Sequence, residues 1–366
     1  MLKNPIFRKV ILSFLMGVLL VGTGHAAQTS EIHVLNRPPL TILDIQYSLD
    51  GQQIARVYAD GRLEVLEADT GEITLTDAPT LPNPLFSASI DWSPTGDRLA
   101  TGIGSQVSMW DMKQGKLLET VKAGGDEPLI HEEGNDYLPE SFTSVLWDST
   151  GTLIVAESMG PRFTVWSIEK HNFIFDLTIG TNPAPVVWLP GEQRISTGVS
   201  FLDLQTQKLV VLRTQKIPEV ETTCGGYGSI RSNEDLSLIA WGTYNGCVVI
   251  IDANTGNQIA GYKIADNGTA IWSISWSPDG SAIVAADEKG AVQVVDLATG
   301  SVTLISQEQG ALYAVDWSPT DNEIAWGGRT DQGETLFETM SVENVRQLMV
   351  SDVHQPEFAI TSTAKP

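Results

Sequence analysis

The sequence predicts an all-β fold, a seven-bladed β-propeller of four-stranded antiparallel blades, and three observations lead to this prediction. A strand followed by a tight turn recurs seven times, beginning at residues 47, 92, 147, 188, 231, 276 and 317. Successive copies lie 45, 55, 41, 43, 45 and 41 residues apart, and a unit of about 40–45 residues is the period of a propeller blade. Each unit also divides into short apolar runs separated by Gly, Asp and Pro, as strands and turns do.

The first 26 residues are predicted to be a signal peptide. Lys3, Arg8 and Lys9 form a positive start, residues 10–22 are uncharged and mostly apolar, and residues 24–26 offer a cleavage site. Thirteen residues of helix reach about 20 Å, short of the roughly 30 Å of a bilayer core. Cleavage is therefore favoured, although a retained anchor remains the alternative. We expect an extracytoplasmic protein, periplasmic or secreted, with no membrane insertion after leader cleavage.

The propeller is predicted to span residues 31–350, and blade 6 shows the pattern of a complete blade. Its inner, second, third and outer strands are expected at residues 270–276, 282–286, 291–296 and 301–306. Pro, Asp and Gly occupy the turns between these strands. The same frame is expected in blade 1 (41–76), blade 2 (87–121), blade 3 (142–177) and blade 5 (226–264).

Two parts of this frame are left open by the sequence. Residues 31–36 and residues 345–350 both read as strands, and either one can be the outer strand of blade 7. In blade 5, Arg231 matches the position of the repeated Trp, which leaves room for a one-residue slip in register. Residues 351–366 are expected to form a flexible polar tail.

The pattern resembles the WD-repeat β-propeller family over roughly residues 41–340. The resemblance rests on Trp-Ser-Pro-x-Gly/Asp turns that begin at Trp92, Trp276 and Trp317, and on a third strand that ends in Trp110 and Asp111. The Gly-His pair of the family is absent from every repeat, so the chain resembles a divergent, exported, bacterial-type member. The resemblance implies a ring of blades around a narrow channel that serves as a binding platform.

Extra chain length concentrates on one face of the predicted ring. The connections between blades and the turns between second and third strands share this face, which we call the loop-bearing face. Residues 77–85, 122–141 and 215–225 are its long connections. Insertions on one rim are typical of a binding surface grafted onto a scaffold.

The connection at residues 122–141 supplies most candidate binding residues. These are Asp126, Glu127, His131, Glu132, Glu133, Asp136 and Tyr137. Their spacing lacks the alternating ligands and turn glycine of a calcium loop. A solvated acidic loop and a protein-contact loop both remain open, and no metal site is assigned.

Two further features bear on the binding face. Cys224 leads into blade 5 and Cys247 begins its third strand, so a disulfide is predicted, with two buried free thiols as the alternative. Five of the ten Trp residues occupy one repeated slot and are expected to pack between blades. Trp272, near the start of an inner strand, is a candidate for the channel mouth.

The charge of the chain narrows the class of partner. The full chain carries a formal net charge of −23, and the leader holds three bases and no acid. Such a charge argues against nucleic acid as a partner, because nucleic-acid binding needs basic patches. We expect a protein partner of unknown identity, and a monomer as the oligomeric state.

Catalytic motifs are missing from the sequence. There is no G-x-S-x-G elbow, no H-E-x-x-H and no phosphate-binding glycine loop. Asp44, Asp91 and Asp316 lie on inner strands and leave one alternative, a metal-dependent hydrolase with a divalent cation in the channel. The sequence otherwise predicts a non-enzymatic binding scaffold with no cofactor, acting through protein–protein interaction on its loop-bearing face.

Overall fold

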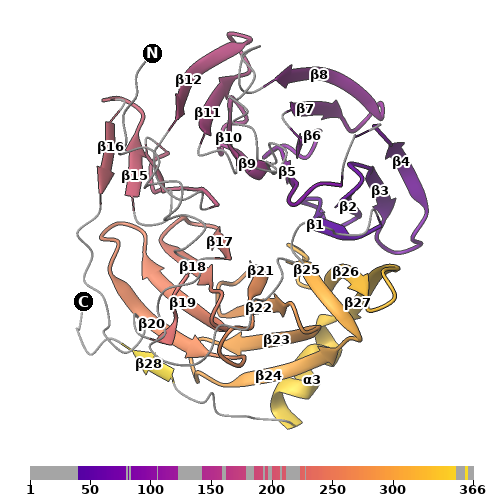
Figure 1. Ribbon diagram of the computed structural model, residues 1–366, viewed down its shortest axis with the longest axis vertical. Coiled ribbons are helices and arrows are strands. Elements are labelled where there is room, and N and C mark those ends of the chain that lie inside the picture. The colour runs from indigo at the N-terminus through magenta and orange to yellow at the C-terminus, as the bar shows by residue number, and fades with distance from the viewer. Residues whose placement is uncertain are drawn as a thin grey trace, which may run out of the picture.

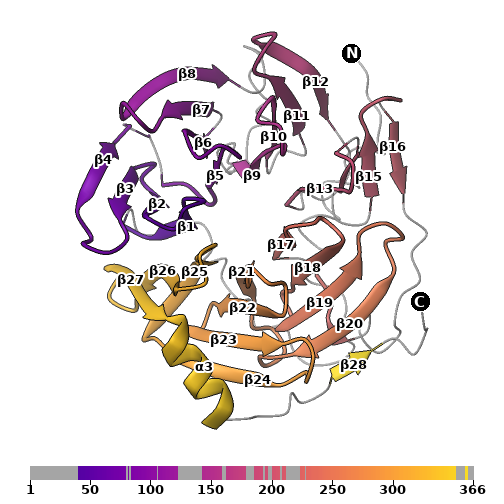
Figure 2. The same ribbon diagram turned by 180° about the vertical axis from the view of Figure 1, so that it is seen from behind.

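The computed structural model describes residues 40–79, 81, 84–104, 106–122, 142–158, 162–178, 185–192, 194–196, 200–206, 208–211, 223–226, 228–351 and 359–361. Within these ranges the chain forms seven antiparallel sheets in a ring, each with its first strand nearest the axis (Figure 1; Figure 2 shows the reverse side). The predicted seven-bladed β-propeller is therefore confirmed.

The blades follow one another around the ring in chain order. Blades 1 to 3 contain β1 (Ile42–Tyr47), β2 (Gln53–Tyr58), β3 (Leu63–Glu67), β4 (Ile73–Asp77), β5 (Ser89–Trp92), β6 (Arg98–Ile103), β7 (Gln106–Asp111), β8 (Lys116–Lys122), β9 (Phe142–Trp147), β10 (Leu153–Ser158), β11 (Arg162–Ser167) and β12 (Asn172–Thr178). Blades 4 and 5 contain β13 (Val187–Trp188), β14 (Arg194–Ser196), β15 (Ser200–Asp203), β16 (Lys208–Val211), β17 (Ser229–Ser232), β18 (Leu238–Gly242), β19 (Cys247–Asp252) and β20 (Gln258–Lys263). Blades 6 and 7 contain β21 (Ile271–Trp276), β22 (Ala282–Asp287), β23 (Ala291–Asp296), β24 (Val302–Gln307), β25 (Gly310–Trp317), β26 (Glu323–Thr330) and β27 (Thr335–Ser341).

The serine of the repeated turn motif closes the turn between the first and second strands. Its hydroxyl accepts the N–H of the first residue of the second strand, with Oγ···N distances of 2.9 Å for Ser48 and Gln53, 3.0 Å for Ser93 and Arg98, and 2.9 Å for Ser277 and Ala282. The turn also needs a left-handed residue, which is Gly280 in blade 6 (φ 68°) and Asp321 in blade 7 (φ 56°). The motif thus has a local backbone role.

The tryptophans of the repeated slot lie between blades, as expected. Trp317 of blade 7, for example, belongs to the same core cluster as Val284 and Val294 of blade 6. In blade 5 the slot holds Ser232, because Ser232 pairs with Ile239 just as Trp276 pairs with Ile283. The prediction that Arg231 matches the tryptophan is therefore wrong by one residue. A small polar residue stands where the other blades place a large ring.

Blade 7 has three strands among the described residues, and a helix follows them. The expected strand at residues 345–350 is wrong, because these residues belong to α3 (Val342–Ser351). Val342 and Val345 recur at helical spacing and are buried in the core shared by blades 6 and 7. At the start of the helix, the Ser341 hydroxyl accepts the N–H of Asn344 at 3.4 Å. The other candidate for the outer strand, residues 31–36, lies outside the described residues.

The expected flexible tail contains a short strand. β28 (Ala359–Thr361) pairs antiparallel with β20, on the outer edge of blade 5 (Figure 1). Blade 5 is therefore a five-stranded sheet. The other residues from 352 onward lie outside the described part of the chain.

Candidate functional site

Polar side chains of the inner strands connect neighbouring blades around the axis. The residue before the slot aromatic accepts the backbone N–H of the next blade's aromatic, at 3.3 Å for Gln46 and Trp92, 2.6 Å for Asp91 and Trp147, 3.2 Å for Ser275 and Trp317, and 2.8 Å for Asp316 and Tyr47. The residue two positions earlier makes a second bond, at 3.0 Å for Asp44 and Ile90, 3.1 Å for Ser89 and Val145, 3.0 Å for Ser144 and Val186, and 3.1 Å for Ser273 and Val315. We call these bonds polar rungs. They satisfy buried amides that no strand partner reaches.

The three inner-strand carboxylates considered for metal or catalysis all take part in these rungs. Both oxygens of Asp44 accept backbone N–H groups, and Asp316 accepts the Tyr47 N–H and the Ser275 hydroxyl. Burial raises the pKa of Asp91 to about 7 and the pKa of Asp316 to about 6, against the opposing effect of these hydrogen bonds. Burial raises the pKa of Asp44 as well. The three carboxylates therefore have a structural role, because each hydrogen-bonds to the inner strand of the next blade.

Arg231 is the cation that faces these acids. Its guanidinium lies 3.7 Å from Asp44 Oδ1, which connects blade 5 to blade 1 on the far side of the ring. The positive charge of Arg231 opposes the rise in the pKa of Asp44, Asp91 and Asp316. Because Ser232 occupies the slot of blade 5, Arg231 stands one position before it. Asp91 and Asp316 hold the same position in their blades, so the Arg231 side chain faces these acids.

Four aromatic rings meet at the loop-bearing end of the inner strands. Trp272 lies at a bulge near the start of β21 and contacts the rings of Tyr244, Tyr313 and Phe86, with centroid distances of 5.5, 6.1 and 6.4 Å. These residues come from blades 5, 6 and 7 and from the connection between blades 1 and 2. Since blades 2 and 6 are not neighbours, the contact of Phe86 with Trp272 spans the end of the axis. We call this group the aromatic cluster.

The aromatic cluster remains accessible from one side. The side chain of Tyr244 is 44% exposed, and the other three rings are half-buried. Exposed aromatic residues on a rigid scaffold are typical of protein interfaces. The cluster is therefore the strongest candidate contact surface among the described residues.

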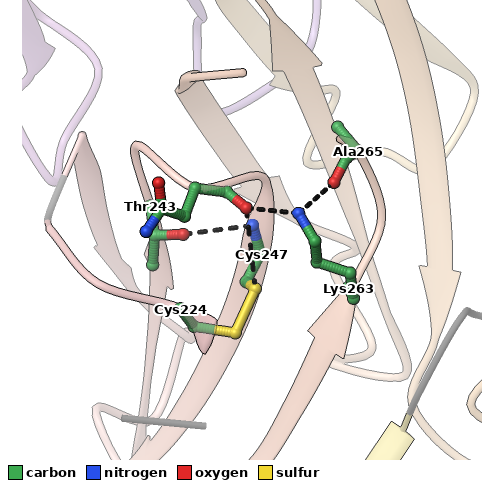
Figure 3. Close-up of a disulfide and its surroundings, with 6 residues drawn as sticks. Cys224, Thr243, Cys247, Lys263 and Ala265 are labelled. Carbon is green, nitrogen blue, oxygen red and sulfur yellow. Dashed lines mark hydrogen bonds between the residues drawn. A yellow bond between two sulfur atoms is a disulfide. The ribbon is translucent and has the colours of Figure 1, made fainter. Parts of the chain in front are cut away.

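A disulfide between Cys224 and Cys247 holds the loop beside this cluster (Figure 3). Their Cα atoms are 5.5 Å apart, and the bridge spans 23 residues. After Cys224 the chain turns at Gly226 (φ 79°), where a Cβ would lie 2.7 Å from Cδ2 of Tyr244. The loop therefore packs directly on the Tyr244 ring, and the disulfide fixes the loop in that position.

Lys263 supports the same turn from the outer strand (Figure 3). Its ammonium donates to the carbonyl of Asn245 at 2.5 Å and to the carbonyl of Ala265. On the other side of the turn, the Cys247 N–H donates to the Thr243 hydroxyl at 3.1 Å. The turn that presents Tyr244 is thus bonded at both ends.

The predicted binding residues fall into two groups. Trp272 lies at the loop-bearing end of the axis, and its part in binding stays a prediction. The candidates of the long insertion lie outside the described residues: Asp126, Glu127, His131, Glu132, Glu133, Asp136 and Tyr137. The sequence reasoning missed Phe86, Tyr244 and Tyr313. Tyr313 stands four residues before Trp317, as Trp272 stands before Trp276, so aligned repeats contain a signal for it. Phe86 and Tyr244 have no such signal, because connections and turns bring them to the cluster.

Two further properties of the described residues bear on other functions. No three His, Cys, Asp or Glu side chains in these ranges gather in a way that would hold a metal ion. The described part of the chain also contains no helix with the length and apolar character needed to cross a membrane.

Comparison with known proteins supports a propeller of the WD-repeat type. Residues 233–320 match the model of the anaphase-promoting complex subunit 4 WD40 domain. A curated relative, the WD repeat-containing protein SL1-17 of Schistosoma mansoni, is 26% identical over 171 residues, which are 44% of this chain and 53% of that protein. The match thus spans about half the length of the relative.

Solved structures show the same fold at low identity. The structure of U3-55K and that of the RRP9 WD40 repeats each have a TM-score of 0.60 and 12% identity, and each match covers 80% of this chain and 90% or 89% of the other. The Cps50 (Swd1) β-propeller domain of Myceliophteria thermophila has a TM-score of 0.62 at 12% identity, covering 81% of this chain and 95% of that one.

Proposed function

We propose that this chain is a non-enzymatic scaffold that binds a protein partner through its loop-bearing face. The proposal rests on the aromatic cluster, in which a disulfide-bonded loop packs on the half-exposed Tyr244. Preorganised aromatic residues supply large contact area at low entropic cost. The WD-repeat character of the matched proteins supports a binding platform.

The inner-strand acids favour the scaffold over a hydrolase. Asp44, Asp91 and Asp316 accept hydrogen bonds from backbone amides of the neighbouring blade. If these oxygens bound a metal ion instead, the hydrogen bonds between the blades would be lost. A hydrolytic metal centre needs carboxylates that can leave such bonds at little cost. The metal-dependent hydrolase is therefore the second candidate, and no contact among the described residues favours it.

The proposed setting is extracytoplasmic, with the chain acting as a monomer. The leader pattern at residues 1–26 and the disulfide of Cys224 with Cys247 both support export, because disulfides persist in oxidising compartments. N-terminal sequencing of the protein isolated from its native cells tests this setting. An intact leader on protein with reduced cysteines would argue against export.

The experiment is a capture assay that compares two faces of the ring. The full chain, a Tyr244→Ala variant and a Leu49→Ala variant are used as baits against cell-envelope and medium fractions. Leu49 is 50% exposed and lies in a turn between first and second strands, on the face opposite Tyr244. Removal of either exposed side chain is expected to leave the fold intact.

The two variants separate the possible outcomes. A partner retained by wild type and Leu49→Ala but lost by Tyr244→Ala supports the proposal. A partner that all three baits retain, or that only Leu49→Ala loses, places the contact elsewhere and overturns it. Metal analysis of the purified chain accompanies the assay, since stoichiometric divalent cation together with hydrolytic activity would favour the second candidate.

A further inference from the structure

The outer strands of the blades differ in charge. In blades 1 to 4 each carries a charged side chain that is exposed or half-exposed: Asp77 in β4, Lys116 in β8, Asp176 in β12 and Lys208 in β16. In β24 there is no charged residue, and the single one in β20, Lys263, is buried and bonded to backbone carbonyls. Charged side chains are a usual device that keeps an edge strand from pairing with another strand.

The C-terminal elements cover the two outer strands that lack this protection. Helix α3 lies beside β24 and buries Val345 in the same core as Ile305 of that strand. Strand β28 pairs with β20 (Figure 1). Among the described residues after blade 7, β28 pairs with the edge of β20, and α3 packs against β24 through its buried side chains.

The contact between β28 and β20 is a backbone ladder. Tyr262 pairs with Ala359, Gly261 with Ile360 and Ala260 with Thr361, in antiparallel register. The receiving strand is already shaped by its blade, because Ala260 and Tyr262 belong to the core shared with blade 6. Its outer edge is thus preformed, and main-chain groups supply most of the recognition.

We propose that the outer edge of β20, at residues 260–262, is a strand-acceptor site for an extended peptide, and that Ala359–Thr361 of the same chain is its resident occupant. The ligand is an extended segment of this chain's own C-terminal sequence, bound antiparallel. This site lies at the periphery of blade 5, away from the aromatic cluster, so it does not depend on the proposed function. Three residue pairs make a weak site, and occupation within one chain relies on an effective concentration on the order of millimolar.

The test uses the full chain with Ala359→Pro, Ile360→Pro and Thr361→Pro combined. Proline has no backbone N–H and cannot donate to a ladder. Hydrogen exchange read by mass spectrometry over β20 is expected to be about tenfold faster or more in this variant at the amides that face β28. Amides of β24, covered by α3, are the internal control and should not change.

A synthetic peptide of residues 352–366 then tests acceptance. Added to the triple-proline variant at about millimolar concentration, it should restore protection of β20, while a peptide with the same three prolines should not. If the variant associates through its open edge, the wild-type peptide should return it to monomer. Unchanged exchange in the variant, or an exposed or associated edge on which the wild-type peptide has no effect, overturns the proposal.

Discussion

Polar rungs join blades 6, 7, 1, 2 and 3 in succession, and we call these blades the regular side of the ring; one further rung leads from blade 3 to blade 4. On the irregular side, formed by blades 4 and 5, no rung among the described residues leads from blade 4 to blade 5 or from blade 5 to blade 6. Two rungs join blade 6 to blade 7, blade 1 to blade 2, and blade 2 to blade 3. From blade 4 to blade 5 the described residues contain no rung, because the equivalent positions are Pro185 and Val187, whose side chains accept no hydrogen bond. The strands of blade 4 are also short, with two residues in β13 and three in β14.

The irregular side of the ring uses other connections. Blade 5 has the disulfide and the ion pair of Arg231 with Asp44. The bond of 3.1 Å from Trp276 Nε1 to the Arg231 carbonyl, by contrast, repeats the indole bond that Trp147 makes to the Asp91 carbonyl. Regular hydrogen bonds therefore join the blades where the inner strands carry side chains that accept them, and individual contacts join the blades where they do not. The aromatic cluster receives Tyr244 from the irregular side, held there by the covalent bridge.

The largest expected effect is the loss of a slot tryptophan on the regular side. Trp147→Ala removes a buried ring and the bond from its Nε1 to the Asp91 carbonyl (3.1 Å), so we expect a loss of about 4–5 kcal/mol. Trp188→Ala in blade 4 should cost about 3 kcal/mol, because its Nε1 has no hydrogen-bond partner among the described residues. Urea unfolding of both variants measures the difference. Equal costs would mean that the Nε1 bond of Trp147 adds no measurable stability to the burial of its ring.

The rung carboxylates predict that stability falls as pH rises. Burial raises the folded-state pKa of Asp91 to about 7 and of Asp316 to about 6, above the ordinary value of 3.8. Their contribution is fully present below the unfolded pKa and is lost as pH rises through the folded values. Between pH 5 and pH 8 we expect a loss of about 3–4 kcal/mol. Chemical denaturation across this range measures it.

A matched variant isolates this pH effect. Asp91→Asn combined with Asp316→Asn keeps an oxygen that accepts the backbone N–H but removes the titration. Its unfolding free energy should fall clearly less than that of wild type from pH 5 to pH 8, and Asp44, whose pKa is also raised by burial, accounts for part of the fall that remains. A variant that loses as much stability as wild type over this range would assign the pH dependence to other groups.

The disulfide between Cys224 and Cys247 is expected to contribute slightly less to stability than the slot tryptophan or the rung carboxylates do. Replacing both cysteines, with Cys224→Ala and Cys247→Ala, removes a bridge over 23 residues and should cost about 3 kcal/mol. Because the loop packs on Tyr244, the near-ultraviolet circular dichroism of the aromatic cluster should weaken as well. A stability loss with an unchanged aromatic spectrum would show that the bridge does not position the cluster.

The smallest expected effect on stability is at the exposed edge of the cluster. Tyr244→Ala removes a side chain that is 44% exposed, so we expect a cost below about 1 kcal/mol. Thermal unfolding measures this cost beside the capture assay. A cost comparable to that of Trp147→Ala would make Tyr244 a core residue and remove it from the contact surface.

The local pattern of the chain predicted the repeated elements well. The strand-turn motif depends on neighbours within a few residues, such as the Ser277 hydroxyl and the Ala282 amide, so it can be read from sequence. The helix at Val342–Ser351 was missed because its short apolar pattern also fits a strand. Burial against blade 6, which the sequence does not reveal, selects the helix.

The number of blades, their order and most of their strands could be predicted from the sequence, because periodic spacing and turn chemistry are local properties. Which residues meet across the ring follows only from the folded chain. Arg231 reaches Asp44, and Phe86 reaches Trp272, although more than 180 residues separate each pair. The physical reason is that ring closure sets these distances through the summed twist and packing of all seven blades, and no short segment of the chain carries that information.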